Sequence, residues 1–362
     1  MMKKTSLTTL LAVLILAILS FDASSQAITT PRTPSPAAFV GQTIGISTIT
    51  VKYSRPSVKG RNVWGELVQY GWTANVGNGP APWRAGANEN TVLELSHDAT
   101  IEGKKVPAGK YGFFLTINED NATGEVILSK DYRSWGHFHY IAANDQMRAP
   151  IKLRDHEMTE MLTYEFINAS RNEVELVLNW EKKQFPVKIA FDVDGIVMAN
   201  AAQELMGVNG FTWQGYNSAA NYAANNKVNL EQASKWSDQA ININRSFATL
   251  SVKANILRQT NQAAEADKVM KEAVTLGNEN ELNTYGYNLL AQGQNDKAIE
   301  VFILNTTKYP NSANAFDSLG EGYATKGDKA NAIKNFKKAL ALNPPAATRA
   351  NSEKFLKQFG VM

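Results

Sequence analysis

The sequence of 362 residues contains no cysteine and only four histidines. The absence of cysteine excludes disulfides, thiol catalysis, thiolate metal sites and a lipid attached to a cysteine behind an export signal. Four catalytic motifs are also missing: the G-x-S-x-G nucleophile elbow, the G-x-x-x-x-G-K-[ST] phosphate loop, the dinucleotide-binding G-x-G-x-x-G and the zinc-binding H-E-x-x-H. We therefore expect no cofactor, and a binding role is favoured over an enzymatic one.

The chain also lacks a large excess of charge of one sign. Lys and Arg number 37 against 34 Asp and Glu, so the formal net charge is +3. Because binding along a nucleic acid requires a strongly basic surface, a nucleic-acid partner is not expected. Hydrophobic residues make up 44% and charged residues 20% of the sequence, as in ordinary soluble proteins. A chain of this length allows about two domains.

Residues 1–25 have the pattern of a cleaved secretory signal peptide. Lys3 and Lys4 precede an apolar run at residues 10–19, and small residues follow at positions 23–25. The apolar run is too short to span a bilayer comfortably, so no membrane span is expected after cleavage. The alternative is an uncleaved N-terminal anchor. We expect a periplasmic or secreted protein.

Residues 26–40 are predicted to be an extended lead-in, and residues 41–197 a β domain. Short segments rich in β-branched and aromatic residues follow one another at spacings near ten residues, separated by turn formers. These predicted strands are residues 43–53, 91–96, 110–118, 125–129, 136–141, 163–167, 173–180 and 186–193. With no long helical pattern between them, they predict an antiparallel β-sandwich or barrel.

Residues 53–91 combine arginines and tryptophans with many glycines and prolines, which excludes a regular helix or a long strand. Long loops in compact domains often bind something, and guanidinium and indole groups suit an anion such as a carboxylate, a phosphate or an acidic sugar. The candidate ligand residues are Arg55, Lys59, Arg61, Trp64, Trp83, Arg84, Asn88 and Glu89. The structural alternative pairs Arg55 or Arg84 with Glu66 or Glu89, while the tryptophans fill the end of the sandwich.

His137 and His139 form a second candidate site. On a strand, residues two apart point to the same face, so both imidazoles could bind one metal ion, with Glu89, Glu94 or His97 as a third ligand. An exposed strand also carries histidines with no function. The pair is therefore only a weak metal candidate.

From about residue 200 the sequence becomes rich in alanine and asparagine and repeats every 34 residues. Gly286, Ala298, Phe302 and Pro310 are followed at that interval by Gly320, Ala332, Phe336 and Pro344. This spacing resembles the tetratricopeptide (TPR) family, in which each repeat is a helical hairpin. The small residues at 320 and 332 let two helices approach, and Phe336 fills the space beside them. We predict a linker at 198–213, repeats over 214–346, and a capping helix in residues 347–362.

A stack of such hairpins presents a groove for a protein or peptide partner. The predicted lining comes from the inner helices: Ser251, Asn255, Arg258, Asn283, Tyr287, Asp317 and Glu321. These polar side chains suit hydrogen bonding to an extended backbone or a helix. The alternative is that the array serves as a rigid strut or a dimer surface.

The β half resembles the bacterial family catalogued as domain of unknown function 2911. The motifs that carry the resemblance are at residues 53–61 (YSRPSVKGR), 63–71 (VWGELVQYG), 83–89 (WRAGANE) and 107–112 (PAGKYG). The resemblance covers about residues 37–180. It implies exported proteins that are often joined to TPR repeats, and it implies no activity. The stretch 72–80 is longer than the family's usual spacing.

These observations predict an exported, two-domain protein: an antiparallel β-sandwich followed by an α-helical TPR solenoid. The leading function is a non-enzymatic adaptor whose groove holds a protein or peptide. Two alternatives stay open. The β domain could bind an anionic small molecule or glycan through the loop at 53–91, or His137 and His139 could serve a metal-dependent enzyme.

Overall fold

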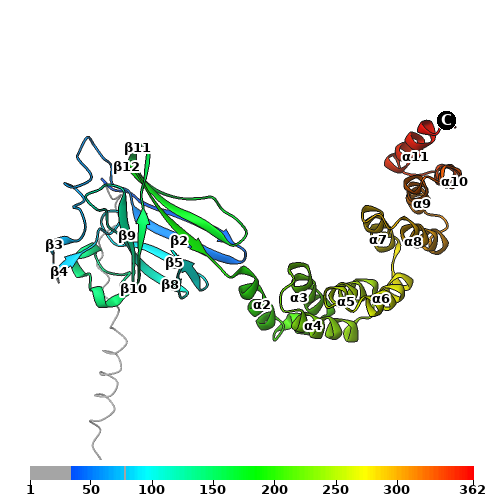
Figure 1. Ribbon diagram of the computed structural model, residues 1–362, viewed down its shortest axis with the longest axis horizontal. Coiled ribbons are helices and arrows are strands. Elements are labelled where there is room, and N and C mark those ends of the chain that lie inside the picture. The colour runs from blue at the N-terminus through cyan, green and yellow to red at the C-terminus, as the bar shows by residue number, and fades with distance from the viewer. Residues whose placement is uncertain (1–33, 77–78) are drawn as a thin grey trace, which may run out of the picture. The chain divides into compact units, whose positions relative to one another are not determined.

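A computed structural model describes residues 34–76 and 79–362 (Figure 1). The chain divides into two compact units, the first ending at Val193 and the second beginning at Asp194. The predicted signal peptide and most of the predicted lead-in lie outside the described residues.

The first unit is an antiparallel β-sandwich, as predicted. One sheet has the order β1 (Ala37–Ile44), β2 (Ser47–Ser54), β5 (Thr91–Leu95), β8 (Gly109–Leu115), β9 (Thr123–Ser129), β10 (Asp145–Lys152). The second has the order β11 (Arg154–Ile167), β12 (Glu173–Ala190), β6 (Ala99–Ile101), β7 (Lys104–Val106). Neighbouring strands run antiparallel in both sheets. Aromatic rings pack between the two sheets. The ring centroid of Tyr164 in β11 lies 4.7 Å from that of Tyr53 in β2 and 5.9 Å from that of Phe113 in β8.

Several strand predictions were wrong in extent or type. Residues 43–53 are not one strand, because Gly45 at φ +59° turns the chain between β1 and β2. The segments 173–180 and 186–193 belong largely to one strand, β12, which ends at Ala190. Residues 136–139 form a short 3-10 helix, η1 (Gly136–His139), instead of a strand. A second 3-10 helix, η2 (Ala142–Asn144), follows it.

The loop at 53–91 is held in place by backbone pairing to both sheets. Val58 donates to the carbonyl of Glu160, and Leu162 donates to the carbonyl of Pro56, so this part of the loop extends the edge at β11. Trp83 exchanges two backbone hydrogen bonds with Leu115 of β8. Between them lies a small hairpin of β3 (Thr73–Val76) and β4 (Gly79–Ala81), which contains most of the long stretch at 72–80.

The second unit is a stack of helical hairpins. It begins with α2 (Val193–Glu204) and the 3-10 helix η3 (Val208–Phe211), so the predicted linker at 198–213 is partly helical. The hairpins are α3 (Trp213–Asn226) with α4 (Leu230–Ile243), α5 (Phe247–Gln259) with α6 (Ala263–Leu276), α7 (Glu279–Ala291) with α8 (Asn295–Lys308), and α9 (Ala313–Lys326) with α10 (Lys329–Ala341). Helix α11 (Ala346–Gln358) follows the last hairpin.

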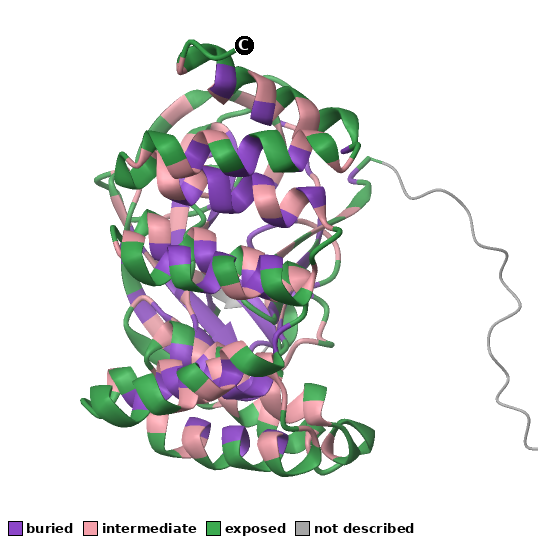
Figure 2. Cartoon of the chain, turned by 90° about the vertical axis from the view of Figure 1, so that its right-hand side faces the viewer, coloured by how far each residue is buried: buried purple, intermediate pink, exposed green. Residues whose placement is uncertain are grey.

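The repeated small residues have the packing role expected of them. A Cβ on Gly286 would lie 2.3 Å from the Phe302 ring, and one on Gly320 would lie 2.8 Å from the Phe336 ring. Phe336 in turn stacks on Phe355 of α11, with ring centroids 4.9 Å apart. Buried residues form stripes along the helices where each hairpin meets the next (Figure 2).

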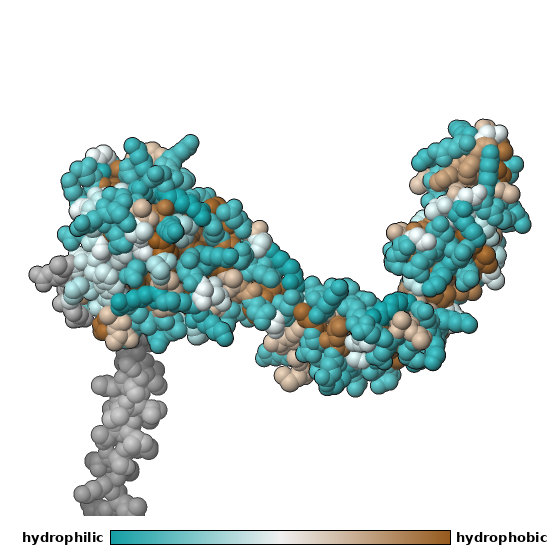
Figure 3. Space-filling view, viewed as in Figure 1, coloured by the Kyte–Doolittle hydropathy of each residue, from teal (hydrophilic) through white to brown (hydrophobic). Residues whose placement is uncertain are grey.

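Side-chain caps fix the starts of the helices. Ser246 and Asn278 form reciprocal capping boxes with the residues three positions later, and Ser312 and Asp328 accept from backbone N–H groups of the next turn. These contacts satisfy amides that the helix itself leaves unpaired. The outer surface of the helices is mainly hydrophilic, with small apolar patches (Figure 3). Within the described part of the chain, none of the helices has the length and apolar character of a membrane span.

Candidate functional site

A cavity of about 400 Å³ lies beside the loop at 53–91 in the β-sandwich. Its cationic lining consists of Lys59, Arg61 and Arg84, together with the imidazole of His137. The remaining lining is apolar or neutral: Pro34, Ser35, Pro56, Ser57, Leu67, Val68, Trp83, Gly86, Ala87 and Trp180. No Asp or Glu is among these described lining residues. The cavity therefore brings together four of the eight predicted ligand residues: Lys59, Arg61, Trp83 and Arg84.

Arg84 is held against the backbone of η1. Its Nη1 donates a 2.9 Å hydrogen bond to the carbonyl oxygen of Asn88. A Cβ on Gly136 would lie 1.9 Å from that nitrogen, so the guanidinium occupies space that only glycine leaves open. Burial lowers the pKa of Arg84, and the charge of Glu89 partly opposes that fall. Arg84 nevertheless remains a cation at neutral pH, because an ordinary arginine titrates far above it.

The other two cations differ in how they are held. Arg61 donates through Nε to the carbonyl oxygen of Val58 at 3.0 Å and through Nη2 to that of Ser57, so it stabilises its own turn. Lys59 has φ +49° and uses its backbone N–H for the carboxylate of Glu160, 3.0 Å away. No hydrogen bond or ion pair of the Lys59 ammonium is found within the described residues, so this charge is available to a ligand.

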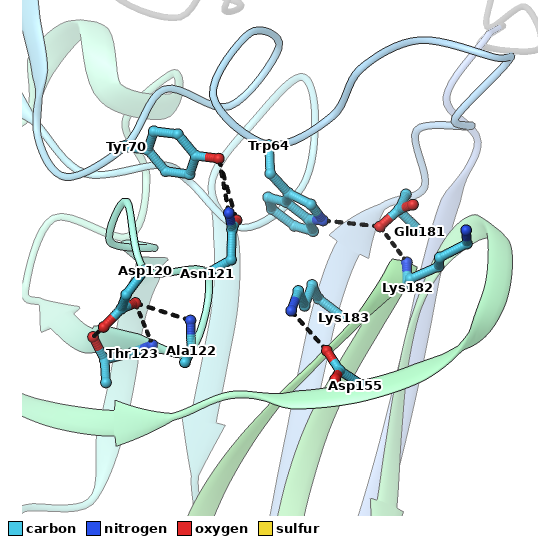
Figure 4. A network of polar contacts seen from close by, with 10 residues as sticks. All are labelled: Trp64, Tyr70, Asp120, Asn121, Ala122, Thr123, Asp155, Glu181, Lys182 and Lys183. Atoms are coloured by element: carbon cyan, nitrogen blue, oxygen red, sulfur yellow. Dashed lines mark hydrogen bonds and ion pairs between the residues drawn. The ribbon is translucent and has the colours of Figure 1, made fainter.

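The cavity adjoins a cluster of aromatic rings. Trp83 stacks on Trp180 with centroids 5.6 Å apart, and Trp64 meets both rings edge-on at 5.8 Å. The indole N–H of Trp64 donates to the carboxylate of Glu181 at 3.2 Å (Figure 4). Trp180 is only 1% exposed, and its indole N–H has no acceptor in the described structure. A buried donor without an acceptor is uncommon, because leaving it unpaired costs free energy.

Four predicted ligand residues do not line this cavity. Arg55 donates to the carbonyl oxygen of Leu162 at 2.9 Å and to the hydroxyl of Thr163 at 2.7 Å, and Trp64 packs in the aromatic cluster. Asn88 donates to the carbonyl oxygen of Ser35 at 3.2 Å. Glu89 lines a different surface depression beside β1.

The predicted pairing of His137 and His139 on one strand face was wrong. Both residues belong to η1, where residues two apart point to different sides of a three-residue turn. His137 stacks on Phe138, while His139 is exposed. Burial lowers the pKa of His137, and the nearby charge of Arg84 lowers it further. Over residues 34–76 and 79–362 we find no group of three or more side chains that could hold a metal ion.

A larger cavity, of about 770 Å³, lies in the helical unit between the hairpins α5/α6 and α7/α8. We call it the inter-hairpin cleft. Its apolar lining is Met270, Val274, Leu289 and Val301, with Tyr285 beside them. Its polar and charged lining is Asn255, Arg258, Asp267, Lys271, Gln292, Gln294, Lys297 and Glu300. The cleft thus has a largely buried apolar floor and a rim that carries charges of both signs.

Arg258 lies at the rim of this cleft. Its Nη2 is 3.3 Å from the carboxylate of Asp267, and both side chains are largely exposed. Burial raises the pKa of Tyr285, and neighbouring Arg258 partly opposes the rise. An exposed ion pair of this kind stabilises the fold little, so it can exchange partners at small cost.

A ladder of amide side chains joins α3 to α5 near the cleft. Asn255 donates to the side-chain oxygen of Asn225 at 3.4 Å, and Gln259 donates to the side-chain oxygen of Asn255 at 3.3 Å and to the carbonyl of Ala224 at 2.7 Å. The side-chain oxygens of Gln259 and Asn283 are buried and have no donor in the described structure. Amide groups of this kind can hydrogen-bond a peptide backbone.

Only two of the seven predicted groove residues, Asn255 and Arg258, line the inter-hairpin cleft. Ser251 donates to the carbonyl of Ala248 within its own helix. Tyr287 donates to Ser318 of the next hairpin at 3.2 Å, and burial raises the pKa of its hydroxyl. These side chains contribute to packing along the stack.

Asp317 and Glu321 were predicted to face a partner, but helix α11 occupies their polar atoms. The amide of Asn351 donates to Asp317 at 2.8 Å and to Glu321 at 2.6 Å, and the hydroxyl of Ser352 donates to the other oxygen of Asp317. Burial raises the pKa of both carboxyl groups. The predicted capping helix therefore covers this end of the predicted groove.

The sequence prediction missed Trp180 and half of the inter-hairpin cleft. Trp180 lies on β12, about a hundred residues after the loop whose cavity it lines, and only the pairing of sheets brings it there. Lys271, Lys297 and Glu300 lie on the outer helices α6 and α8, whereas the prediction considered only inner helices. An available signal was the run of charged residues at the start of α8.

Comparison with known proteins agrees with this division of the chain. A family model described as "Protein of unknown function (DUF2911)" matches residues 35–189. The first unit is a DUF2911 domain. A second model, described as "Tetratricopeptide repeat", matches residues 313–345, which contain α9 and α10. The chain therefore joins a DUF2911 domain to TPR repeats, and such repeats indicate a protein-interaction role. No curated protein matches the chain.

Solved structures similar to this chain resemble its helical unit. YrrB, titled a TPR protein with an unusual peptide-binding site, is 21% identical, and the match covers 43% of this chain and 81% of YrrB. Pseudomonas aeruginosa pilF is 22% identical, with 42% and 71% covered, and MamA from Desulfovibrio magneticus RS-1 is 17% identical, with 43% and 88% covered. The TM-score is 0.29 in all three cases. The fold of the helical unit rests on its own hairpins and on the repeat match.

Proposed function

We propose that this chain is an exported, non-enzymatic adaptor whose TPR unit binds a segment of a partner protein in the inter-hairpin cleft. The partner segment would place apolar side chains on the floor of the cleft and charged or amide groups at its rim. The DUF2911 domain would be carried with it as a second recognition element.

The observation that carries this proposal is the composition of the inter-hairpin cleft. An apolar floor surrounded by a polar rim is the usual anatomy of a protein-binding surface. The volume of about 770 Å³ falls within the range of well-formed binding pockets. Rim charges of both signs suit a partner segment with mixed charges better than a strongly acidic or basic one.

A position-specific photo-cross-linking experiment tests this proposal. A photo-reactive amino acid replaces Gln292, which lines the cleft, in the full chain expressed in its native host. In a matched control it replaces Lys337, which is exposed on α10 and does not line the cleft. We expect a partner cross-linked at 292 and absent at 337, and a synthetic peptide of the cross-linked segment should bind the purified full chain.

Substitutions at the rim separate binding from folding. Arg258→Ala combined with Lys297→Ala should weaken binding of that peptide at least tenfold and leave the melting temperature of the helical unit nearly unchanged, because both groups are at the surface. The same proteins cross-linked at 292 and 337, or equal peptide affinity in the double variant, would contradict the cleft as the binding site.

Export is the second part of the proposal. The support is the order of lysines, apolar run and small residues in the first 25 positions. N-terminal sequencing of the protein recovered from the native cell envelope should begin near Gln26. Recovery from the cytoplasm with its first residues intact would contradict export.

A further inference from the structure

We infer that the DUF2911 domain binds a small organic anion of about hexose size in its 400 Å³ cavity, with Lys59 and Arg84 as the groups that hold the carboxylate or phosphate. This site is separate from the inter-hairpin cleft, and its test is independent of the test of the adaptor proposal.

The first argument is the charge of the cavity. Three cationic side chains and one imidazole line it, and no carboxylate is among the described lining residues. Glu89 acts on Arg84 electrostatically but is exposed and lies outside this lining. Arg84 is partly buried, while Lys59 and Arg61 are exposed. Cationic side chains gathered at one concave site attract anions, and a charged donor makes a stronger hydrogen bond to an anion than a neutral donor does.

The second argument is the placement of Arg84. Its guanidinium lies against the bare backbone of Gly136, which has φ +58° and leaves no room for a side chain. A single hydrogen bond, to the carbonyl of Asn88, holds Nη1. An arginine has five N–H donors, so most of those on Arg84 are not used by the hydrogen bonds found in the described structure. The loop thus positions the Arg84 guanidinium and leaves most of its N–H donors available to a ligand.

The third argument concerns the size and polarity of the ligand. The volume lies in the range that encloses small organic molecules, and it is much larger than a bare phosphate or sulfate requires. Leu67, Val68 and the ring of Trp83 add apolar surface to the lining. An aliphatic or sugar ring can pack on such a surface while its acidic group meets the cations.

Three hexoses that differ only at one carbon test the proposal by isothermal titration calorimetry on the full chain. Glucuronate carries a carboxylate there, glucose 6-phosphate a phosphate, and glucose a neutral hydroxyl group. We expect at least one of the two anions to bind with a sub-millimolar dissociation constant, and glucose not to bind. The anion that binds more tightly identifies the acidic group.

A substitution at Lys59 connects binding to the cavity. Lys59→Gln should weaken binding about tenfold, the effect of losing one charge-assisted contact. Lys105→Gln on strand β7 serves as the matched control and should leave binding unchanged.

Gly136→Ala provides a second variant, since its added Cβ would displace the Arg84 guanidinium. It should abolish anion binding while the helical unit keeps its melting temperature. No heat of binding for either anion would overturn the proposal. Binding of either anion that is unchanged in Lys59→Gln and Gly136→Ala would equally overturn it.

Discussion

The two cavities of this protein differ in how many of the predicted site residues line them. In the DUF2911 domain, four of the eight candidates line one cavity, and two of the others, Arg55 and Asn88, donate to backbone carbonyl groups. In the TPR unit, two of seven candidates line the inter-hairpin cleft, and Tyr287, Asp317 and Glu321 bond to the first helix of the next hairpin or to α11.

This difference teaches how each fold uses polar side chains. A long loop on a sandwich has many backbone groups to satisfy, so arginines such as Arg55 and Arg61 serve the loop itself. In a helical repeat, the backbone N–H and C=O groups hydrogen-bond within each helix. Its polar side chains can therefore form hydrogen bonds from one inner helix to the next. In both units, the side chains available to a ligand or partner are those whose polar atoms are not taken up by hydrogen bonds within the fold.

The largest expected effect tests whether the two units fold independently. Phe302→Ala removes a fully buried ring from the helical core and should destabilise that unit by about 3–5 kcal/mol. Phe113→Ala is the matched change in the sandwich core. Calorimetric scans should show only the helical transition lowered in the first variant and only the sandwich transition lowered in the second. A common shift of both transitions in either variant would contradict independent folding.

The next effect separates a structural arginine from an available cation. Arg55→Gln loses the bonds to Leu162 and Thr163 and should destabilise the sandwich by about 2 kcal/mol, because those acceptors lose a charged donor. Lys59→Gln should change the stability by less than about 0.5 kcal/mol. Urea unfolding of both full-length variants measures this. Equal destabilisation would show that Lys59 also supports the loop.

A comparable effect is expected where α11 covers the predicted groove. Asn351→Ala removes the donor shared by Asp317 and Glu321 and should weaken docking of α11 by about 2 kcal/mol, since two partly buried carboxyl groups lose a partner. Hydrogen exchange of the α11 amides should accelerate, while exchange in α3 and α4 stays as in the parent chain. Uniform acceleration over the whole unit would argue against a local role.

The docking of α11 should also depend on pH, and the sign follows from the carboxyl groups. Burial raises the pKa of Asp317 and Glu321 above their ordinary values of 3.8 and 4.5. Their stabilising contribution is then fully present below those ordinary values and is lost as the pH rises through the raised values. Protection factors of α11 should therefore fall as the pH is increased across that window. In Asp317→Asn this fall should be smaller; an unchanged pH profile would remove Asp317 as its source.

The smallest effect concerns ion pairs at the surface, which should change the stability of the two units alike. Asp267→Asn in the TPR unit and Glu175→Gln in the sandwich each break an ion pair with an arginine. Each change should alter the free energy of unfolding by less than about 1 kcal/mol. Denaturant titration at low and high salt checks this, and a salt-dependent loss much above that value would indicate a wider charge network.

Much of the fold follows from local patterns in the sequence. The β-branched residues along β2 and the 34-residue spacing of small and aromatic residues each describe contacts inside one element or between adjacent elements, and the structure has the strand and the repeat that they predict. The prediction of a strand at 136–141 was wrong. Its aromatic residues are typical of a strand, but Gly136 at φ +58° begins a 3-10 turn instead.

By itself, the sequence determined the two-domain order, the helical repeat, the absence of thiol chemistry and the loop in which one candidate site lies. Only the tertiary structure decided which side chains remain available there. Trp180 reaches the cavity through the pairing of distant strands, and α11 removes Asp317 and Glu321 from the groove. The physical reason is that hydrogen-bond partners and burial depend on residues far apart in the chain, which no local pattern records.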